Sequence, residues 1–145
     1  MPQKLSKEIN TLKGEIKDEY RDVGENIRHW QHMRFTSMTV FMAVSAGLLT
    51  ALFQWRANLP ILASISVRVI GVMSVLVFWI QDERIVKYWQ HFSTRAKALE
   101  RVLKFQQYST TPPRNRIFTS GNAIRLLYTT FLVFWLATLV LYSQF

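Results

Sequence analysis

The stretch from Leu59 to Ile80 constrains this chain most, because it has 22 residues and a single charge, Arg68, near its middle. An apolar run of this length is typical of a transmembrane helix. An arginine at the centre of such a helix costs about 2.5–3.5 kcal/mol on insertion scales. The other two apolar runs of the chain contain no Asp or Glu that would pair with it. The direction in which Arg68 points is therefore central to what the protein does.

The two further apolar runs are Phe35–Trp55 and Ile124–Tyr142, and the 18 basic and nine acidic residues lie almost wholly outside the three runs. This segregation predicts an all-α membrane protein with transmembrane helices over residues 35–55, 59–80 and 123–142. The chain has no cysteine, so disulfides and thiolate metal sites are excluded. No cleavable signal peptide precedes the first run, which we expect to act as an uncleaved anchor.

Residues 1–34 are predicted to form a cytoplasmic amphipathic helix. Its apolar positions, spaced three or four apart, are Leu5, Ile9, Leu12, Ile16, Tyr20, Val23, Ile27 and Trp30. This near-heptad spacing favours packing against another helix. A helix lying on the membrane surface is the alternative, and the six acidic residues argue against it. No Pro or Gly separates this helix from Phe35, so we expect it to continue directly into the first span.

The second span is also expected to continue, through a cytoplasmic helical extension over residues 81–108. The tight turn at 55–58 makes the first two spans an antiparallel hairpin, which places both extensions on one side. The stripe Phe92, Ala96, Leu99 and Leu103 is then expected to meet the stripe of the N-terminal helix. Pro112 and Pro113 end this extension within a basic interfacial linker, residues 109–122.

Orientation follows from the basic residues. The N-terminal segment has seven Lys or Arg and the 81–122 segment has eight, whereas the 54–58 turn has only Arg56. The positive-inside rule places the N-terminus and the long loop in the cytoplasm of a bacterial inner membrane, and the C-terminus outside. Arg114, Arg116 and Arg125 are expected to bind lipid headgroups, since anionic lipid attracts such residues.

Arg68 shares one helical face with Ser64, Gly71 and Val75. In one interpretation Arg68 reaches toward the outer headgroups or bonds a neighbouring helix. In the other these four residues line a water-filled path. Three spans are too few to enclose such a path, so several copies would have to surround it, and a ring of arginines selects for anions.

Signals for catalysis or metal binding are weak. The three histidines, His29, His32 and His91, have no carboxylate at suitable spacing, so surface positions are expected and no metal or other cofactor is predicted. Arg84 and His91 fit the R-x4-6-H spacing of HEPN ribonucleases, a pattern loose enough to arise by chance. A basic patch with Lys97, Arg101 and Lys104 would suit RNA, but anionic lipid explains it better beside a membrane.

Two segments carry a resemblance to a known family: EYRDVGENIRHWQHMRF, running into the first span, and KYWQHFSTRAKALERVL, following the second. With the spans between them they resemble the RipA-like family of small bacterial inner-membrane proteins and the related membrane accessory protein of type VI-B CRISPR systems. The resemblance implies a ring-shaped homo-oligomer, such as an octamer, and a membrane pore that helps antiviral defence. At 145 residues this sequence is short for the group, and we expect no added soluble domain.

We therefore expect a homo-oligomeric pore of six or more subunits. Its cytoplasmic collar is held by Ile16, Tyr20, Val23 and Ile27 against Phe92, Ala96, Leu99 and Leu103. One alternative is a non-conducting membrane scaffold that recruits a cytosolic partner, such as a protein of a defence system. The other is a membrane-tethered ribonuclease, which would make the protein an enzyme. No specific nucleic acid is expected as a partner.

Overall fold

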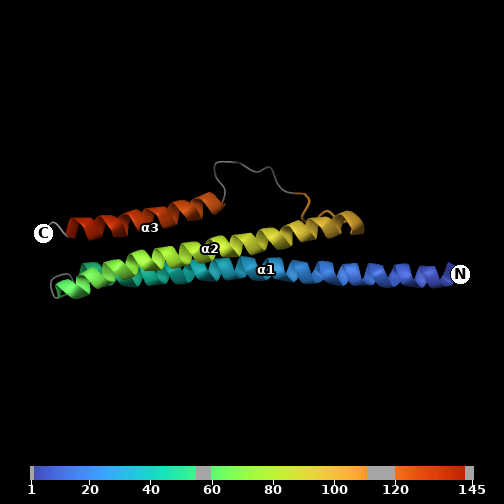
Figure 1. Ribbon diagram of the computed structural model, residues 1–145, viewed down its shortest axis with the longest axis horizontal. Helices are drawn as coiled ribbons and strands as arrows, with labels where there is room; N and C mark the ends of the chain where they lie inside the picture. The colour runs from blue at the N-terminus through green and yellow to red at the C-terminus, as the bar shows by residue number, and fades with distance from the viewer. Residues whose placement is uncertain (1, 55–59, 111–119, 143–145) are drawn as a thin grey trace. The chain divides into compact units, whose positions relative to one another are not determined.

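The computed structural model describes residues 2–54, 60–110 and 120–142, and within these ranges the side chains at 2, 4–7, 9, 120 and 142 are left out. The described residues form three helices: α1 (Pro2–Gln54), α2 (Ile61–Leu103) and α3 (Ser120–Tyr142) (Figure 1). No strand occurs among the described residues. All three helices are long and apolar enough to cross a membrane, as a multi-pass membrane protein requires.

Helix α1 is a single helix of 53 residues, which confirms that the N-terminal amphipathic helix runs into the first apolar segment without a break. Gly14 and Gly24 both lie inside it. An isolated glycine weakens a helix by up to about 1 kcal/mol, and the length of α1 and its packing contacts offset this.

Helix α2 also continues beyond its apolar segment, but it ends at Leu103 and not at residue 108 as predicted. Lys104 takes a left-handed backbone conformation with φ of 59°. The N–H of Phe105 then donates to the carbonyl of Glu100 at 3.2 Å, which closes the helix end. At the other end, the carbonyl of Pro60 accepts the N–H of Ser64 at 3.0 Å and begins the helix.

The chain divides into two compact units, each with its own core. Unit 1 comprises Met1–Met33 and Ile85–Pro113, and unit 2 comprises Arg34–Arg84 and Arg114–Phe145. In unit 1, Val23 and Ile27 of α1 pack against Ala96 and Leu99 of α2. The half-buried residues around them are Ile16, Tyr20, Phe92 and Tyr108. Seven of the eight predicted seam residues thus belong to this cluster; Leu103 is half-buried outside it, and Tyr108 joins instead.

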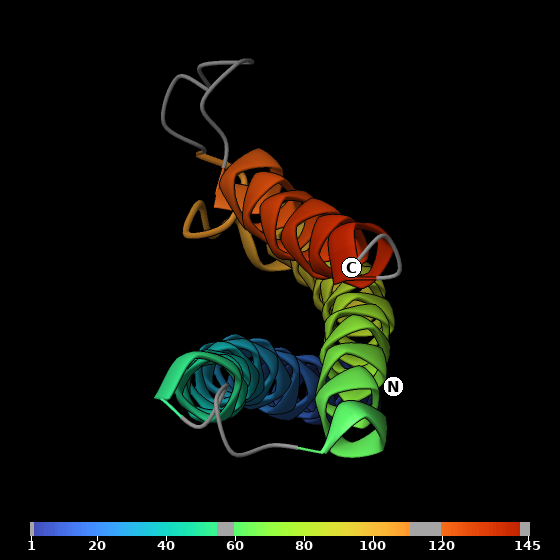
Figure 2. The same ribbon diagram turned by 90° about the vertical axis from the view of Figure 1, so that its left-hand side faces the viewer.

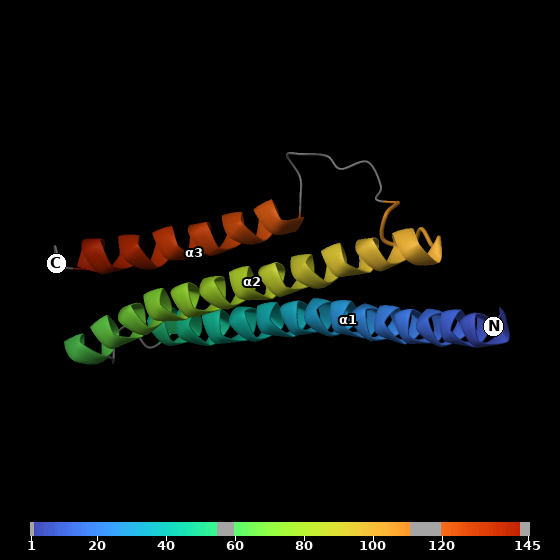
Figure 3. The ribbon, with the colours of Figure 1, turned by 45° about the vertical axis from the view of Figure 1, so that its right-hand side comes forward.

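In unit 2, α3 lies alongside the first part of α2, as the end-on and oblique views show (Figures 2 and 3). The core contains Phe41 and Leu52 of α1, Val75 of α2, and Tyr128 and Trp135 of α3. The Phe41 ring meets Tyr128 edge-on with ring centroids 5.0 Å apart, so all three helices meet in one aromatic core.

Some predictions fall outside the described residues. They are the 55–58 turn, most of the 109–122 linker and the two headgroup residues Arg114 and Arg116.

Candidate functional site

The face of α2 that carries Arg68 is buried within unit 2. Ser64, Arg68, Gly71 and Val75 are all buried, and Arg68 is only 6% exposed. The Arg68 guanidinium donates from Nη1 to the carbonyl of Ser64 at 2.8 Å and also to the Ser64 hydroxyl. These bonds one turn apart let a charged side chain lie within an apolar segment.

Gly71 is the closest approach of α2 to α3. A Cβ built at Gly71 would lie 2.4 Å from Cδ2 of Trp135, so the indole ring rests directly on the α2 backbone. Helix packing in membranes commonly uses a glycine in this way. Of the four residues predicted to line a path, Gly71 and Val75 therefore lie at the contact between α2 and α3 within one protomer, and Ser64 and Arg68 are buried on the same face of α2. A lining role for them stays a prediction.

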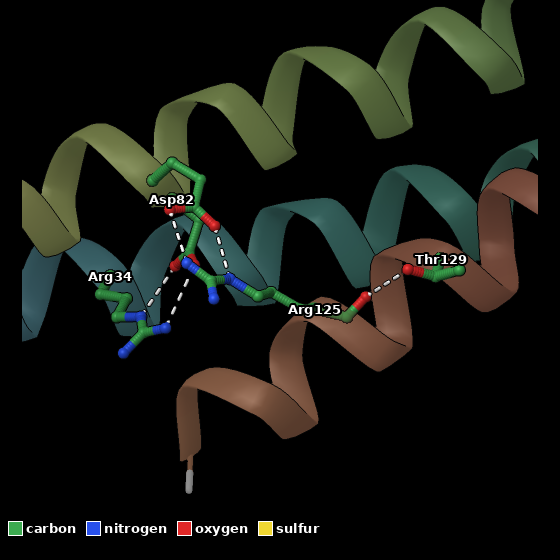
Figure 4. Close-up of polar contacts among 5 residues, drawn as sticks. Arg34, Asp82, Arg125 and Thr129 are labelled. Carbon is green, nitrogen blue, oxygen red and sulfur yellow. Dashed lines mark hydrogen bonds and ion pairs between the residues drawn. The ribbon is translucent and has the colours of Figure 1, made fainter.

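Asp82 extends the same buried face of α2 to the predicted inner boundary of the membrane. Its carboxylate accepts two hydrogen bonds from Arg34 of α1, from Nε at 2.7 Å and from Nη2 at 3.1 Å (Figure 4). The side chains of Arg34 and Asp82 are 24% and 8% exposed. A bidentate guanidinium–carboxylate pair this enclosed is strong, and it helps to hold α1 against α2 in this register.

Glu83, the residue after Asp82, links α2 to α3. Arg125 donates from Nε and Nη2 to the Glu83 carboxylate at 2.7 and 3.0 Å. In the same helix the Thr129 hydroxyl donates to the carbonyl of Arg125 at 2.8 Å (Figure 4). Arg125, predicted to bind lipid headgroups, is thus engaged by a carboxylate, and the headgroup role stays a prediction. Sequence reasoning missed both pairs, although Arg34, Asp82, Glu83 and Arg125 all stand at span ends on one predicted side of the membrane.

The outward face of α1 in unit 2 differs from the outward faces of α2 and α3. Exposed large apolar residues lie on it too, namely Phe35, Val40, Met42, Val44 and Phe53. Between them runs a line of small, hydroxyl and amide side chains spaced three or four apart, all of them exposed: Thr36, Thr39, Ala43, Gly47, Thr50 and Gln54. We name this set the α1 stripe. On α2 and α3 the exposed residues are mostly large and apolar, including Ile61, Leu62, Val69, Ile70, Met73, Val77, Leu126, Val133, Leu136 and Val140. Large apolar side chains suit lipid, whereas small ones let another helix approach closely.

Unit 1 contains one buried carboxylate, Glu100, which is 1% exposed. It accepts hydrogen bonds from the Tyr20 hydroxyl at 2.9 Å and from the N–H groups of Tyr108 and Ser109 at 2.7 and 2.9 Å. Burial favours the neutral acid, but these donors outweigh burial and lower the pKa of Glu100. Burial and the bond to Glu100 raise the pKa of Tyr20 to about 12. Glu100 thus joins α1, α2 and the segment that follows α2.

We predict that Glu100→Gln destabilises unit 1 by about 1–3 kcal/mol at pH 7, since the amide cannot accept all of these hydrogen bonds. Because the folded-state pKa of Glu100 is lowered, its contribution is complete above the unfolded pKa of about 4.3 and is lost as pH falls through the folded pKa. Tyr20 has a raised pKa, so its contribution to stability is complete below pH 10 and is lost as pH rises from about 10 toward 12.

Hydrogen exchange of residues 101–110 between pH 7 and pH 3.5 measures the loss of stability in acid. Glu8→Gln, at an exposed carboxylate of α1, is the control. Equal protection in the two variants at pH 7 would contradict the prediction.

The other candidate residues lie on the surface. His29, His32 and His91 are exposed, as is Arg84. Across the part of the chain that the structure describes, no three His, Cys, Asp or Glu side chains gather as metal ligands would. Comparison with protein-family models, curated proteins and solved structures finds no match to this chain.

Proposed function

We propose that this chain is the protomer of a homo-oligomeric pore in the bacterial inner membrane, with the α1 stripe turned toward neighbouring copies and the central path. The observation that supports this is the character of the stripe, which points away from the protomer core and is poorly suited to lipid. Six or more copies, with an octamer favoured, enclose the path that three spans alone cannot. Cytoplasmic antiparallel hairpins formed by unit 1 make the collar.

The α1 stripe suits such a path chemically. Its threonine hydroxyls offer hydrogen bonds to water and ions, while the small residues Ala43 and Gly47 let a neighbouring helix approach closely. Thr39 already donates to the carbonyl of Phe35 at 3.1 Å, so its oxygen faces the path as an acceptor. In this proposal Arg68 supports the wall from within α2, where it bonds Ser64, and Gly71 holds the contact with α3. For Arg68 to line the path, the face of α2 that carries it would have to separate from Trp135 of α3.

The physiological role we propose is permeabilisation or depolarisation of the host membrane in antiviral defence. The resemblance of residues 19–35 and 87–103 to RipA-like proteins supports this role.

Liposome flux tests the proposal. We predict that the unmodified protein conducts small ions and that Gly47→Leu lowers flux about tenfold or more. A leucine on the stripe blocks close helix contact, and about 1.4 kcal/mol of lost association is worth a factor of ten. Val69→Leu, on the exposed apolar face of α2, is the matched control and should conduct normally. Unchanged flux in Gly47→Leu would place the path elsewhere.

A non-conducting scaffold is the second candidate, favoured by the burial of Arg68 inside the protomer, where it acts as a packing residue. Assembled protein that conducts no ions at any lipid composition would support it over the pore.

A further inference from the structure

Helix α1 of unit 1 carries four of its six acidic residues on one side. Glu15, Asp18, Asp22 and Glu25 are spaced three or four apart and all are exposed. We call these four the acidic stripe. Each lies one or two residues ahead of a seam position, which turns the stripe away from the packed face. Asp18 approaches Arg21 at 3.9 Å, but both side chains are about 70% exposed, so this pair leaves the stripe open.

Helix α2 carries the opposite charge in the same unit. Residues 85–110 contain five basic residues and one carboxylate, Glu100, which is buried. Arg95 is used within the protomer, where its Nε donates to Glu19 at 2.7 Å. Lys87 and Arg101 are exposed and Lys97 is half-buried, on the side of α2 opposite Ala96 and Leu99. We call these three residues the basic face.

We propose that the acidic stripe of one copy binds the basic face of the next copy, so that the hairpins join head to tail. This rests on the homo-oligomer of the proposed function and names the contact that sets its order. Two acidic stripes repel each other, as do two basic faces, so a two-fold symmetric contact through either surface is disfavoured. A contact between two different surfaces repeats from copy to copy, and it forms a ring when the rotation between copies closes.

A second copy fits these surfaces better than a polyanion does. Nucleic acid or an anionic membrane would attract the basic face but would meet the acidic stripe of the same unit as a repulsive surface. A second copy satisfies both surfaces at once. Single exposed ion pairs contribute about 0–1 kcal/mol, so the contact depends on several pairs acting together and weakens as salt rises.

Charge reversal tests the contact. The first variant, Asp18→Lys/Asp22→Lys/Glu25→Lys, makes the stripe basic, and the second, Lys87→Glu/Arg101→Glu, makes the basic face acidic. Each alone places like charges together, and we expect ring dissociation to rise about tenfold or more. Co-expression of the two variants restores opposite charges at every contact of a ring in which they alternate, and so does one chain carrying all five changes. Both should form rings again.

Native mass in lipid discs is the measurement, at low salt and at about 0.15 M, where the Debye length is about 8 Å. Lys13→Glu/Lys17→Glu, at exposed positions outside both surfaces, matches the second variant in net charge and should assemble normally. Full rings in both single-surface variants, or no recovery on co-expression, would overturn this contact and leave the proposed pore intact. If the only defect of the second variant is weaker binding to anionic vesicles, the basic face binds lipid, and the proposed contact between copies is overturned as well. A monomeric unmodified protein would overturn both proposals.

Discussion

Replacing Gly71 with alanine is expected to loosen α3 from α2 and to destabilise unit 2 by about 1–3 kcal/mol, the usual cost of overpacking a core. The new Cβ would lie 2.4–2.7 Å from three atoms of the Trp135 ring. Trp135 is fully buried, with 0% exposure, so the ring cannot turn aside without disturbing Val75 and Tyr128 in the same cluster.

Unfolding in mixed micelles with rising SDS measures this effect. Gly47→Ala is the matched control, because no described atom lies within 4 Å of a Cβ at that position. Gly71→Ala/Trp135→Leu is expected to recover part of the loss relative to Trp135→Leu alone, since the smaller side chain leaves room for the methyl group. Equal stability of Gly71→Ala and Gly47→Ala would show that α3 does not rest on Gly71.

Removing the carboxylate of Asp82 is expected to have the second large effect. Asp82→Ala leaves the Arg34 guanidinium three-quarters enclosed without its two hydrogen bonds. Truncating one partner of such a pair costs about 2–5 kcal/mol, mostly because the remaining charge is left desolvated.

The neighbouring ion pair, Glu83 with Arg125, provides the control, and the stability of each variant is measured by the same SDS unfolding experiment. The side chains of Glu83 and Arg125 are 32% and 55% exposed, so Glu83→Gln should cost less than about 1 kcal/mol. Replacing both partners, in Arg34→Met/Asp82→Leu, removes the buried charge altogether and should recover most of the stability. Asp82→Ala and Glu83→Gln variants of equal stability would contradict this account.

Much of the fold follows from the sequence because long helices leave local signals. Apolar length predicts the three helices, and the lack of any Pro or Gly near residue 34 predicts that α1 continues without a break. The predicted end of α2, at residue 108, was wrong by five residues, since the helix ends at Leu103. The end of α2 depends on the buried Glu100 carboxylate, which accepts hydrogen bonds from the N–H groups of Tyr108 and Ser109 after the chain has turned. The spacing of apolar residues does not reveal these bonds.

The Arg68 face shows a different limit. Its spacing correctly groups Ser64, Arg68, Gly71 and Val75 on one side of a helix, but spacing alone cannot say which neighbour covers that side. Trp135 of α3 covers Gly71 on that side in the protomer. Likewise, the pairing of Arg34 with Asp82, 48 positions apart, depends on the register of two helices. That register is set by contacts along their whole length.

The most direct test of the central claim is the native mass of the unmodified protein in lipid discs drawn from its own membrane. We predict six or more identical subunits, with eight favoured, since only a closed ring turns the α1 stripe away from lipid in every copy. A monomer or dimer under these conditions would contradict the pore. The α1 stripe would then face lipid, and unit 1 would be the surface on which to seek a partner.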